Sequence, residues 1–443
     1  MRLKKVVALS LAVVMVTGML GACAKSSEET GKGEVTSVSK QEQGTNEKEE
    51  PQKLTVTVWD NTTSPQFRIV VDGFKALHPE VEIEFVDTAA AEYDDKLTIM
   101  LATGDSDPDI VFVKNAEMQT TLKEKGQILN LDEYIKRDGV DLSIYNGGAE
   151  QLQMDGSNYT MPYRSDWYLL FYNKDLFDAA GVEYPSNDMT WAEYEELARK
   201  MTSGSGSSKI YGTHNHTWMG LIANWALQDG KHTLADGNYD FLKEAYEQGL
   251  RLQDDGIVQS YANLKTANIH YSSAFQQQQS AMLPMGSWFI GTMISAINSG
   301  DANFNWGMAT IPHPEGVEAG NTVGSITPIA INSATDSPEL AWEFVKYATS
   351  LEAGKLLAKE GIFSASQSDE IIDILTQVDG MPEGSKEALT VKTLYLDRPL
   401  NPNMASIRKV IEEEHDLIMI GETDIDTGIA NMNKRVEEVL KNK

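Results

Sequence analysis

The stretch from Lys53 to Asp87 decides the fold, because it reads as strand, helix and strand in direct succession. Its first part, "KLTVTVWD" (53–60), alternates apolar and polar residues, and "EVEIEFVD" (80–87) repeats that pattern. Between them, "FRIVVDGFKALHP" (67–79) has apolar residues at helical spacing. Two strands joined by such a helix run parallel, so the stretch predicts a βαβ unit.

Predicted helices and strands continue to alternate along the chain. "AEYDDKLTIMLATG" (91–104) is helical in period, and the apolar run after Asp109 indicates a third strand that is buried on both faces. Thr190 and Glu193 form a capping box that opens a helix. A second helix is expected over 337–361, with Ser337 as cap, Pro338 at its first position and Gly361 as its stop. Alternating strands and helices predict an α/β fold.

The first residues have the composition of a secretory signal. Charged Met1–Lys5 precede an almost purely apolar run, Val6–Met19, and small residues follow at Gly21 and Ala22. The apolar run is shorter than the ~20 residues that a membrane-spanning helix needs. We expect residues 1–22 to be a signal peptide and the rest to be soluble.

Cys23 is the only cysteine and closes the sequence "LGAC". This sequence resembles the bacterial lipobox, whose cysteine becomes the lipidated first residue of the mature protein; the alternative is an ordinary signal with an incidental cysteine. Two or three acyl chains, such as palmitate, would give lasting attachment. Residues 24–52 are polar and lack aromatics, so we expect 23–52 to be a lipidated cysteine and a flexible tether.

Charge and length narrow the function. The chain has 37 basic and 66 acidic side chains, a formal net charge of −29, which makes nucleic acid a poor partner. About 390 residues remain beyond the tether, more than one hydrophobic core usually serves, so two lobes are expected.

The sequence carries no familiar catalytic motif: no nucleophile elbow, no P-loop and no zinc-binding His-Glu-x-x-His. His214 and His216 lie close together without a nearby carboxylate, so we interpret them as pocket wall or loop and not as metal ligands. The acidic pairs 94–95 and 254–255 could serve a glycosidase, but their helix-like context favours surface charge. We predict no enzyme activity, no cofactor and no bound metal.

Aromatic and polar residues recur where strand-like runs end. In open α/β sheets, ligands bind beyond the carboxyl ends of the strands, so these loops are expected to meet at one cleft. Aromatic faces together with amide, carboxylate and guanidinium groups are what a sugar requires. The candidate ligand-binding residues from these loops are Trp59, Asp60, Asn115, Arg164, Asp166, Trp167, His216, Trp218 and Trp288.

Not every tryptophan indicates a ligand. Two lie on amphipathic helices and are assigned to packing, Trp191 and Trp342, and two more are interpreted as structural, Trp225 and Trp306. Trp288 lies between Gly286 and Gly291, and we expect these glycines to let a ligand approach the backbone.

Six segments together resemble the carbohydrate-binding solute-binding proteins of ABC importers, extracellular solute-binding protein family 1, which includes maltodextrin-binding protein. They are "GDSDPDIVFV" (104–113), "YTMPYRSDWYLLFYNKDLFDAAGV" (159–182), "TWAEYEELARKMT" (190–202), "SAMLPMGSWFIG" (280–291), "WGMATIPHP" (306–314) and "SPELAWEFVKYATSLEAGKLLAKEG" (337–361). The resemblance covers Lys53 to Lys443 in the family's order. It implies two α/β lobes, joined by hinge crossovers, that close on a ligand in the cleft between them.

The resemblance also implies the lobe limits. "MPYRSD" (161–166) would be the first crossover and "TVGSITPIAI" (322–331), with the candidate ligand residue Ser325, the second; a third would lie near "LDRPLNPNM" (396–404). Lobe one would then comprise 53–163 plus 326–391, and lobe two would comprise 164–325 plus 392–443.

Three candidate residues fall on positions that contact the ligand in the family: Asn115 after the third strand, Asp166 past the first hinge, and Trp288. Where maltodextrin binders carry an aromatic after that strand, this chain has Val113 and Lys114. A maltodextrin ligand is therefore disfavoured.

The resemblance implies a non-catalytic, monomeric receptor, lipid-anchored at the extracellular face of the bacterial cytoplasmic membrane. It would close on a sugar, an oligosaccharide by preference, and deliver it to the permease subunits of an ABC importer. Arg164 leaves room for an acidic sugar. Two alternatives stay open: the same fold binding a peptide, polyamine or chelated metal, although Asp60 and Asp166 are few carboxylates for a polyamine, and a surface glycosidase.

Overall fold

The computed structural model describes residues 52–62 and 65–441. The predicted signal peptide, the predicted lipidation site Cys23 and the predicted tether all lie outside these residues, apart from Gln52. No helix in the described part of the chain combines the length and the apolar character that a bilayer crossing requires.

Within the described residues, nine strands form one sheet, and they differ in length from three residues to 13. They are β1 (Gln52–Trp59), β2 (Val81–Thr88), β3 (Ile110–Phe112), β4 (Met161–Asn173), β5 (Tyr211–Thr213), β6 (Ser280–Gly286), β7 (Trp306–Thr310), β8 (Asn321–Ile331) and β9 (Thr393–Leu396).

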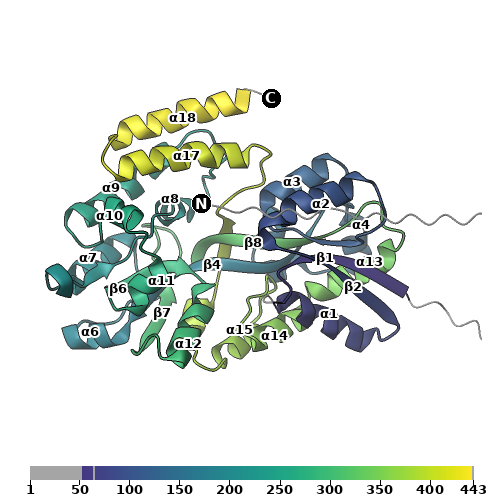
Figure 1. Ribbon diagram of the computed structural model, residues 1–443, viewed down its shortest axis with the longest axis horizontal. Helices are drawn as coiled ribbons and strands as arrows, with labels where there is room; N and C mark the ends of the chain where they lie inside the picture. The colour runs from purple at the N-terminus through teal and green to yellow at the C-terminus, as the bar shows by residue number, and fades with distance from the viewer. Residues whose placement is uncertain (1–51, 63–64, 442–443) are drawn as a thin grey trace, which may run out of the picture. The chain divides into compact units, whose positions relative to one another are not determined.

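Helices surround this sheet (Figure 1). They are α1 (Gln66–Leu77), α2 (Tyr93–Ala102), α3 (Ala116–Glu124), α4 (Asp132–Asp138), α5 (Gly148–Gln151), α6 (Lys174–Ala180), α7 (Trp191–Met201), α8 (Gly220–Leu227), α9 (Lys243–Asp254), α10 (Tyr261–Thr266), α11 (Tyr271–Gln276), α12 (Phe289–Ser299), α13 (Pro338–Ala348), α14 (Leu351–Lys359), α15 (Asp369–Thr376), α16 (Ser385–Leu389), α17 (Met404–Met419) and α18 (Ile425–Lys441). Short 3₁₀ turns lie at Ala90–Glu92, Leu142–Tyr145, Gly206–Ser208 and Asp240–Leu242.

The opening stretch folds as its sequence predicts. β1 and β2 pair in parallel from Gln52 opposite Val81 to Trp59 opposite Thr88, and α1 connects them. β3 pairs with β1 in parallel and all three of its residues are buried, so the βαβ unit and the third buried strand are confirmed.

Helix capping confirms one prediction and corrects another. The Thr190 side chain accepts a hydrogen bond from the Glu193 amide, and the Glu193 carboxylate accepts one from the Thr190 amide. The single helix expected over 337–361 is wrong: α13 ends at Ala348 and α14 begins at Leu351. Ser350 accepts a hydrogen bond from the Ala353 amide and so starts a new helix in the middle of the apolar pattern.

β4 and β8 run between two groups of elements: β1, β2 and β3 with their helices on one side, and β5, β6 and β7 with their helices on the other (Figure 1). The first half of β4 pairs antiparallel with β8, from Met161 opposite Ile329 to Trp167 opposite Gly324. Its second half pairs with β6 and β7. At its far end, β8 pairs with β3, so the two long strands join the opening βαβ unit to the remaining sheet.

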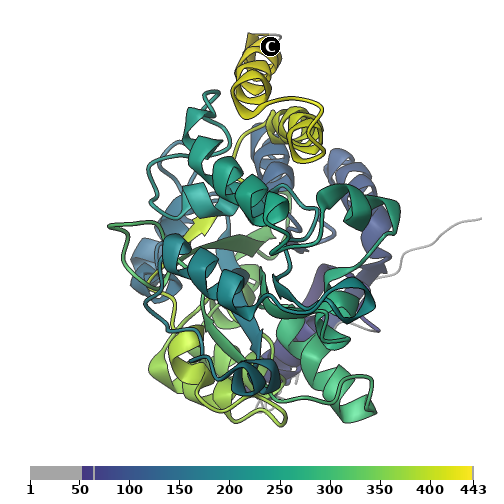
Figure 2. The ribbon, with the colours of Figure 1, turned by 90° about the vertical axis from the view of Figure 1, so that its left-hand side faces the viewer.

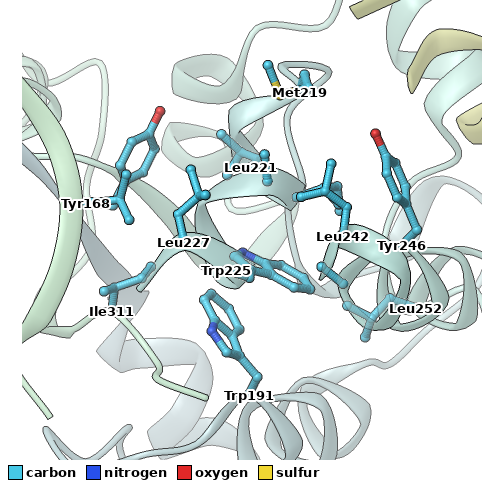
Figure 3. Packing of buried hydrophobic residues seen from close by; sticks show 14 of the residues in the cluster. Tyr168, Trp191, Met219, Leu221, Trp225, Leu227, Leu242, Tyr246, Leu252 and Ile311 are labelled. Atoms are coloured by element: carbon cyan, nitrogen blue, oxygen red, sulfur yellow. The ribbon is translucent and has the colours of Figure 1, made fainter. Parts of the chain in front are cut away.

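The buried apolar residues form separate clusters. One contains the apolar residues of β1 and α1 with Trp342, and a smaller one lies around Tyr93. Another is built on α7 to α9 and receives residues from α17 and α18; in it Trp191 and Trp225 stack with ring centroids 4.1 Å apart (Figure 3). All four tryptophans that the sequence assigned to packing or structure are buried.

A further cluster combines Trp167 and residues of β6, β7 and α12 with residues of α15 and α16. It therefore mixes segments that the predicted limits divide between two lobes. The limits at 163, 325 and 391 remain predictions.

The last described residues form a helical pair. α17 and α18 lie side by side (Figure 2). Ile407, Ile411 and Ile418 of α17, with Met432 and Val436 of α18, belong to the cluster of α7 to α9.

Gly324 of β8 lies directly against the β4 backbone, and it offers a test of the β4–β8 pairing. A Cβ there would lie 2.0 Å from the Asp166 carbonyl oxygen. Replacing Gly324 with Ala should cost about 1–3 kcal/mol of unfolding free energy, because backbone has to move. Urea unfolding measures it. Gly291→Ala is the control, since nothing lies within 4 Å of a Cβ there; equal stability of both variants would contradict the observed pairing.

Candidate functional site

Four rings from three separate segments form a contiguous cluster, which we call the aromatic platform: His216, Trp218, Tyr271 and Trp288. His216 contacts Trp218 edge-on at 4.7 Å between ring centroids and Tyr271 at 5.2 Å. Trp218 lies 5.4 Å from Tyr271 and 6.4 Å from Trp288. The Trp288 indole N–H donates to the Tyr271 hydroxyl at 3.3 Å, which orients the ring.

Two members of the platform are unusually exposed for their size. Trp218 is 41% exposed and Trp288 is 37% exposed, whereas Trp191, Trp225 and Trp306 are buried. Exposed indole faces cost hydrophobic free energy in the unliganded protein, so a neighbouring pair of them is typical of a binding surface. The structure thus brings three predicted residues together: His216, Trp218 and Trp288.

Gly286 has a different role from the one predicted. A Cβ at this position would lie 2.0 Å from the Trp288 ring, so the glycine leaves room for that indole and not for a ligand. The Tyr168 ring also meets the Trp288 ring edge-on, at 5.6 Å between ring centroids. Trp288 therefore rests on Gly286 and on Tyr168 of β4 while part of its ring stays exposed.

The segment before Trp218 buries polar atoms that have no partner. His214 Nε2, His216 Nδ1 and both polar side-chain atoms of Asn215 are shielded from solvent without a hydrogen bond. Burial lowers the pKa of His214 to about 3 and that of His216 to about 4, with neighbouring histidines adding to both shifts. Both imidazoles are neutral at pH 7. Among the described residues, no three His, Cys, Asp or Glu side chains are arranged to hold a metal ion.

The first crossover places charged groups beside the platform. Asp166 Oδ1 accepts a hydrogen bond from Ser287 Oγ at 2.8 Å, and its Oδ2 lies 3.6 Å from the Arg164 guanidinium. Ser325 lies opposite Asp166 in the β4–β8 ladder. The Arg164 Nε atom is buried without a partner. Three predicted residues, Arg164, Asp166 and Ser325, therefore lie together next to the residue that precedes Trp288.

Trp167 lies elsewhere. It is 2% exposed and packs edge-on against Phe363 at 4.8 Å between ring centroids. Both residues belong to the cluster that contains residues of β6, β7 and α12. Successive side chains of a strand point to opposite faces, so Asp166 and Tyr168 share the face of the platform and Trp167 cannot. Its expected role as a ligand contact is not what the structure shows, and Tyr168 occupies the place expected of it.

The remaining predicted residues form a second group, at the carboxyl ends of β1 and β3. Trp59 is half-buried and contacts Phe67 and Tyr93 edge-on at 4.9 and 5.0 Å. Lys114 Nζ lies 5.9 Å from the Trp59 ring centroid, and it donates to the Ala90 carbonyl oxygen at 2.6 Å. This group therefore also pairs an aromatic ring with polar side chains.

Asp60 and Asn115 have structural partners within this second group. Asp60 has a φ of 47°, and its Oδ1 accepts a hydrogen bond from the Ala90 amide at 3.0 Å. Asn115 caps α3 by accepting from the Met118 amide at 2.8 Å, and its Nδ2 donates to Asp94 Oδ2 at 3.1 Å. Buried Oδ1 atoms of Asn61 and Asp94 have no partner there.

Sequence reasoning missed Tyr168, Tyr271 and Ser287. Tyr168 can be predicted from the alternation of side chains along a strand, because it follows Asp166 by two residues and therefore lies on the same face. Tyr271 lies in "NIHYSSAF", which carries no strand-end signal. Asp397, in the predicted third crossover, bonds to β8: its amide donates to the Gly324 carbonyl oxygen at 2.8 Å. Burial raises the pKa of its carboxyl group.

A family model supports a functional assignment for this geometry. The model described as bacterial extracellular solute-binding protein matches residues 60–355. A lactose-binding protein of Rhizobium radiobacter is 23% identical over 337 residues, covering 70% of this chain and 74% of that protein. An sn-glycerol-3-phosphate-binding periplasmic protein of Brucella abortus is 23% identical over 352 residues, covering 74% and 79%.

A solved structure is similar over nearly the whole fold. The crystal structure of a sugar transporter from Rhizobium etli, in an open conformation, is 39% identical, has a TM-score of 0.85, and covers 87% of this chain and 99% of that one. This likeness confirms the predicted two-lobe α/β fold.

The neutral histidines predict an acid-sensitive fold. Their pKa values of about 3 and 4 lie below the ordinary value near 6.5, so the unfolded chain binds protons that the folded chain excludes. Their contribution to stability is therefore complete above about pH 6.5 and is lost as the pH falls towards 4. Urea unfolding between pH 7.5 and 4.5 measures this. As the pH falls, the free energy of unfolding should decrease less steeply for His216→Gln than for the native chain.

The exposed His232 is the control for that titration. His232→Gln should leave the slope of stability against pH closer to the native one. A native slope in His216→Gln would contradict the buried, neutral state of this imidazole.

Proposed function

This chain belongs to the bacterial extracellular solute-binding proteins, and we propose that its solute is a sugar, which it delivers to the membrane subunits of an ABC importer. The observation that carries the proposal is the aromatic platform, with its exposed Trp218 and Trp288 beside buried polar atoms that lack partners. A sugar offers apolar ring faces for the indoles and hydroxyls for those atoms.

The comparisons support a sugar in two ways. One relative is named a lactose-binding protein, and the similar solved structure is named a sugar transporter. The relatives are binding proteins by name, which favours a receptor without catalytic activity.

A second candidate solute is sn-glycerol 3-phosphate, the ligand in another relative's name. The unpartnered Arg164 Nε favours an anion. Two features weigh against sn-glycerol 3-phosphate: the Arg164 guanidinium lies 3.6 Å from Asp166, and both His216 of the platform and the nearby His214 are neutral at pH 7. A phosphate needs cationic donors that are not already paired.

The proposed mechanism is closure of two lobes about β4, β8 and the third crossover. A sugar held by the platform and by the group around Trp59 would favour the closed form through its higher affinity for that form. Asp166, Arg164 and Ser325, at the crossover itself, would orient hydroxyl groups. The importer would then recognise the closed form of a monomeric receptor.

The anchoring belongs to the same proposal. The family is extracellular, and we infer that Cys23 carries the lipid that holds the protein at the outer face of the cytoplasmic membrane, with 24–52 as its tether.

Replacing Trp288 with Ala tests the site. The variant should lose the thermal shift that a sugar produces in the native protein, because it removes the ring that packs on Tyr168 and bonds to Tyr271. Differential scanning fluorimetry with lactose, other mono- and oligosaccharides and sn-glycerol 3-phosphate provides the measurement.

Tyr184→Ala is the matched control, since Tyr184 is 42% exposed and contacts Tyr172 and Phe177 away from the platform. It should keep the sugar shift. A shift that survives in Trp288→Ala would misplace the site, a shift with sn-glycerol 3-phosphate alone would select the second candidate, and sugar turnover would reverse the receptor assignment.

Cys23→Ser tests the anchor. The native precursor expressed in a bacterial host should partition into detergent and yield a lipid-modified Cys23 by mass spectrometry, whereas the serine variant should remain in the aqueous phase. An unmodified cysteine in membrane-bound native protein would refute the lipid anchor without affecting the sugar site.

A further inference from the structure

The segment that carries His216 and Trp218 is held by few hydrogen bonds. The His214 amide donates to the Met282 carbonyl oxygen at 3.0 Å, and the next backbone bonds begin with the Trp218 and Met219 carbonyls at the start of α8. Within the described chain, residues 215–217 have one hydrogen bond: the Tyr261 hydroxyl donates to the Thr217 carbonyl oxygen at 3.1 Å. This single polar contact ties the segment to the protein body.

Tyr261 is itself firmly held. It is the first residue of α10 and is 3% exposed. Its amide donates to Gln253 Oε1 at 2.8 Å, and its ring meets His415 of α17 edge-on at 5.4 Å. The phenol therefore presents its hydroxyl to Thr217 from a fixed position.

The same hydroxyl also contacts the C-terminal helical pair. Tyr261 Oη lies within hydrogen-bond distance of Asp416 Oδ1 on α17. Lys265 Nζ donates to Asp416 Oδ2 at 3.0 Å and lies 5.4 Å from the centre of the Tyr261 ring. Burial, followed by the bond to Asp416, raises the pKa of Tyr261, so the hydroxyl keeps its proton and remains a donor. One proton serves two acceptors, Thr217 and Asp416.

We propose that Tyr261 is a positioning residue of the ligand site: its hydroxyl, held by α10 and α17, sets the placement of the segment from Asn215 to Trp218. The inference rests on the proposed function, because that segment supplies two rings of the platform and the unpartnered atoms of Asn215 and His216. It also gives α17 a part in ligand binding, although no residue of α17 belongs to the platform.

Tyr261→Phe removes the hydroxyl and keeps the ring. Tyr246→Phe is the matched control: Tyr246 is a buried tyrosine of the same cluster (Figure 3), and its hydroxyl bonds to His415 Nδ1 at 3.1 Å and not to the segment. Tyr261→Phe loses the hydroxyl contacts with Thr217 and Asp416, and Tyr246→Phe loses the one with His415, so both variants should melt at a lower temperature than the native protein.

Two readouts separate positioning from stability. The first is the pKa of His216, followed by NMR of the imidazole protons and assigned with His216→Gln; it needs no ligand. In Tyr261→Phe this pKa should rise from about 4 towards 6.5, because a displaced segment hydrates the ring. The second is calorimetric affinity for the sugar that gives the largest thermal shift, which should weaken about 5- to 10-fold. Tyr246→Phe should change neither.

The outcomes distinguish the two proposals. If Tyr261→Phe matches Tyr246→Phe in both readouts, Tyr261 has no positioning role and the inference fails, while sugar binding by the native protein still supports the proposed function. If the His216 pKa rises but affinity holds, the segment is outside the ligand site and the inference is also overturned. If the pKa rises and no sugar binds the native protein, placement of the segment by Tyr261 is upheld and the sugar assignment fails.

Discussion

The antiparallel pairing of β4 with β8 is the constraint on which the rest of the structure depends. It connects the opening βαβ unit to the strands that carry the platform, and it sets Asp166 opposite Ser325. Ser287 then bonds to Asp166, which places the following residue, Trp288, beside Tyr168. A shift of one residue in this register would turn Asp166 and Tyr168 away from the platform and bring Trp167 towards it, since side chains alternate along a strand.

The parts of the fold that depend on local pattern could be predicted from the sequence. The βαβ unit follows from period alone, and the capping box at Thr190 follows from two side chains three residues apart. The predictions that failed concern features that tertiary contacts determine. The helix ends before Ser350 although the apolar pattern continues past it. The sheet face on which Trp167 lies depends on strand register. Gly286 is a glycine because the Trp288 ring folds back over it.

The candidate site could be predicted in part for the same reason. Strand ends are visible in the sequence, so the loops of Trp218 and Trp288 can be predicted, while Tyr271 joins them from the start of α11, where no strand ends. Asp60 and Asn115 were identified as polar residues at strand ends, and both have local partners in a turn and a helix cap. Residue type cannot distinguish a capping amide from a ligand-binding one, because both roles use the same atoms.

The packing of Trp288 has a consequence for the entropy of binding. Its ring rests over Gly286, meets Tyr168 edge-on and donates its N–H to Tyr271, so its rotamer is chosen when the chain folds. Immobilising a free side chain at an interface costs about 0.5–1.5 kcal/mol. A ligand that stacks on this indole, as proposed, would avoid that cost, and the glycine beneath the ring would thereby contribute to affinity without touching the ligand.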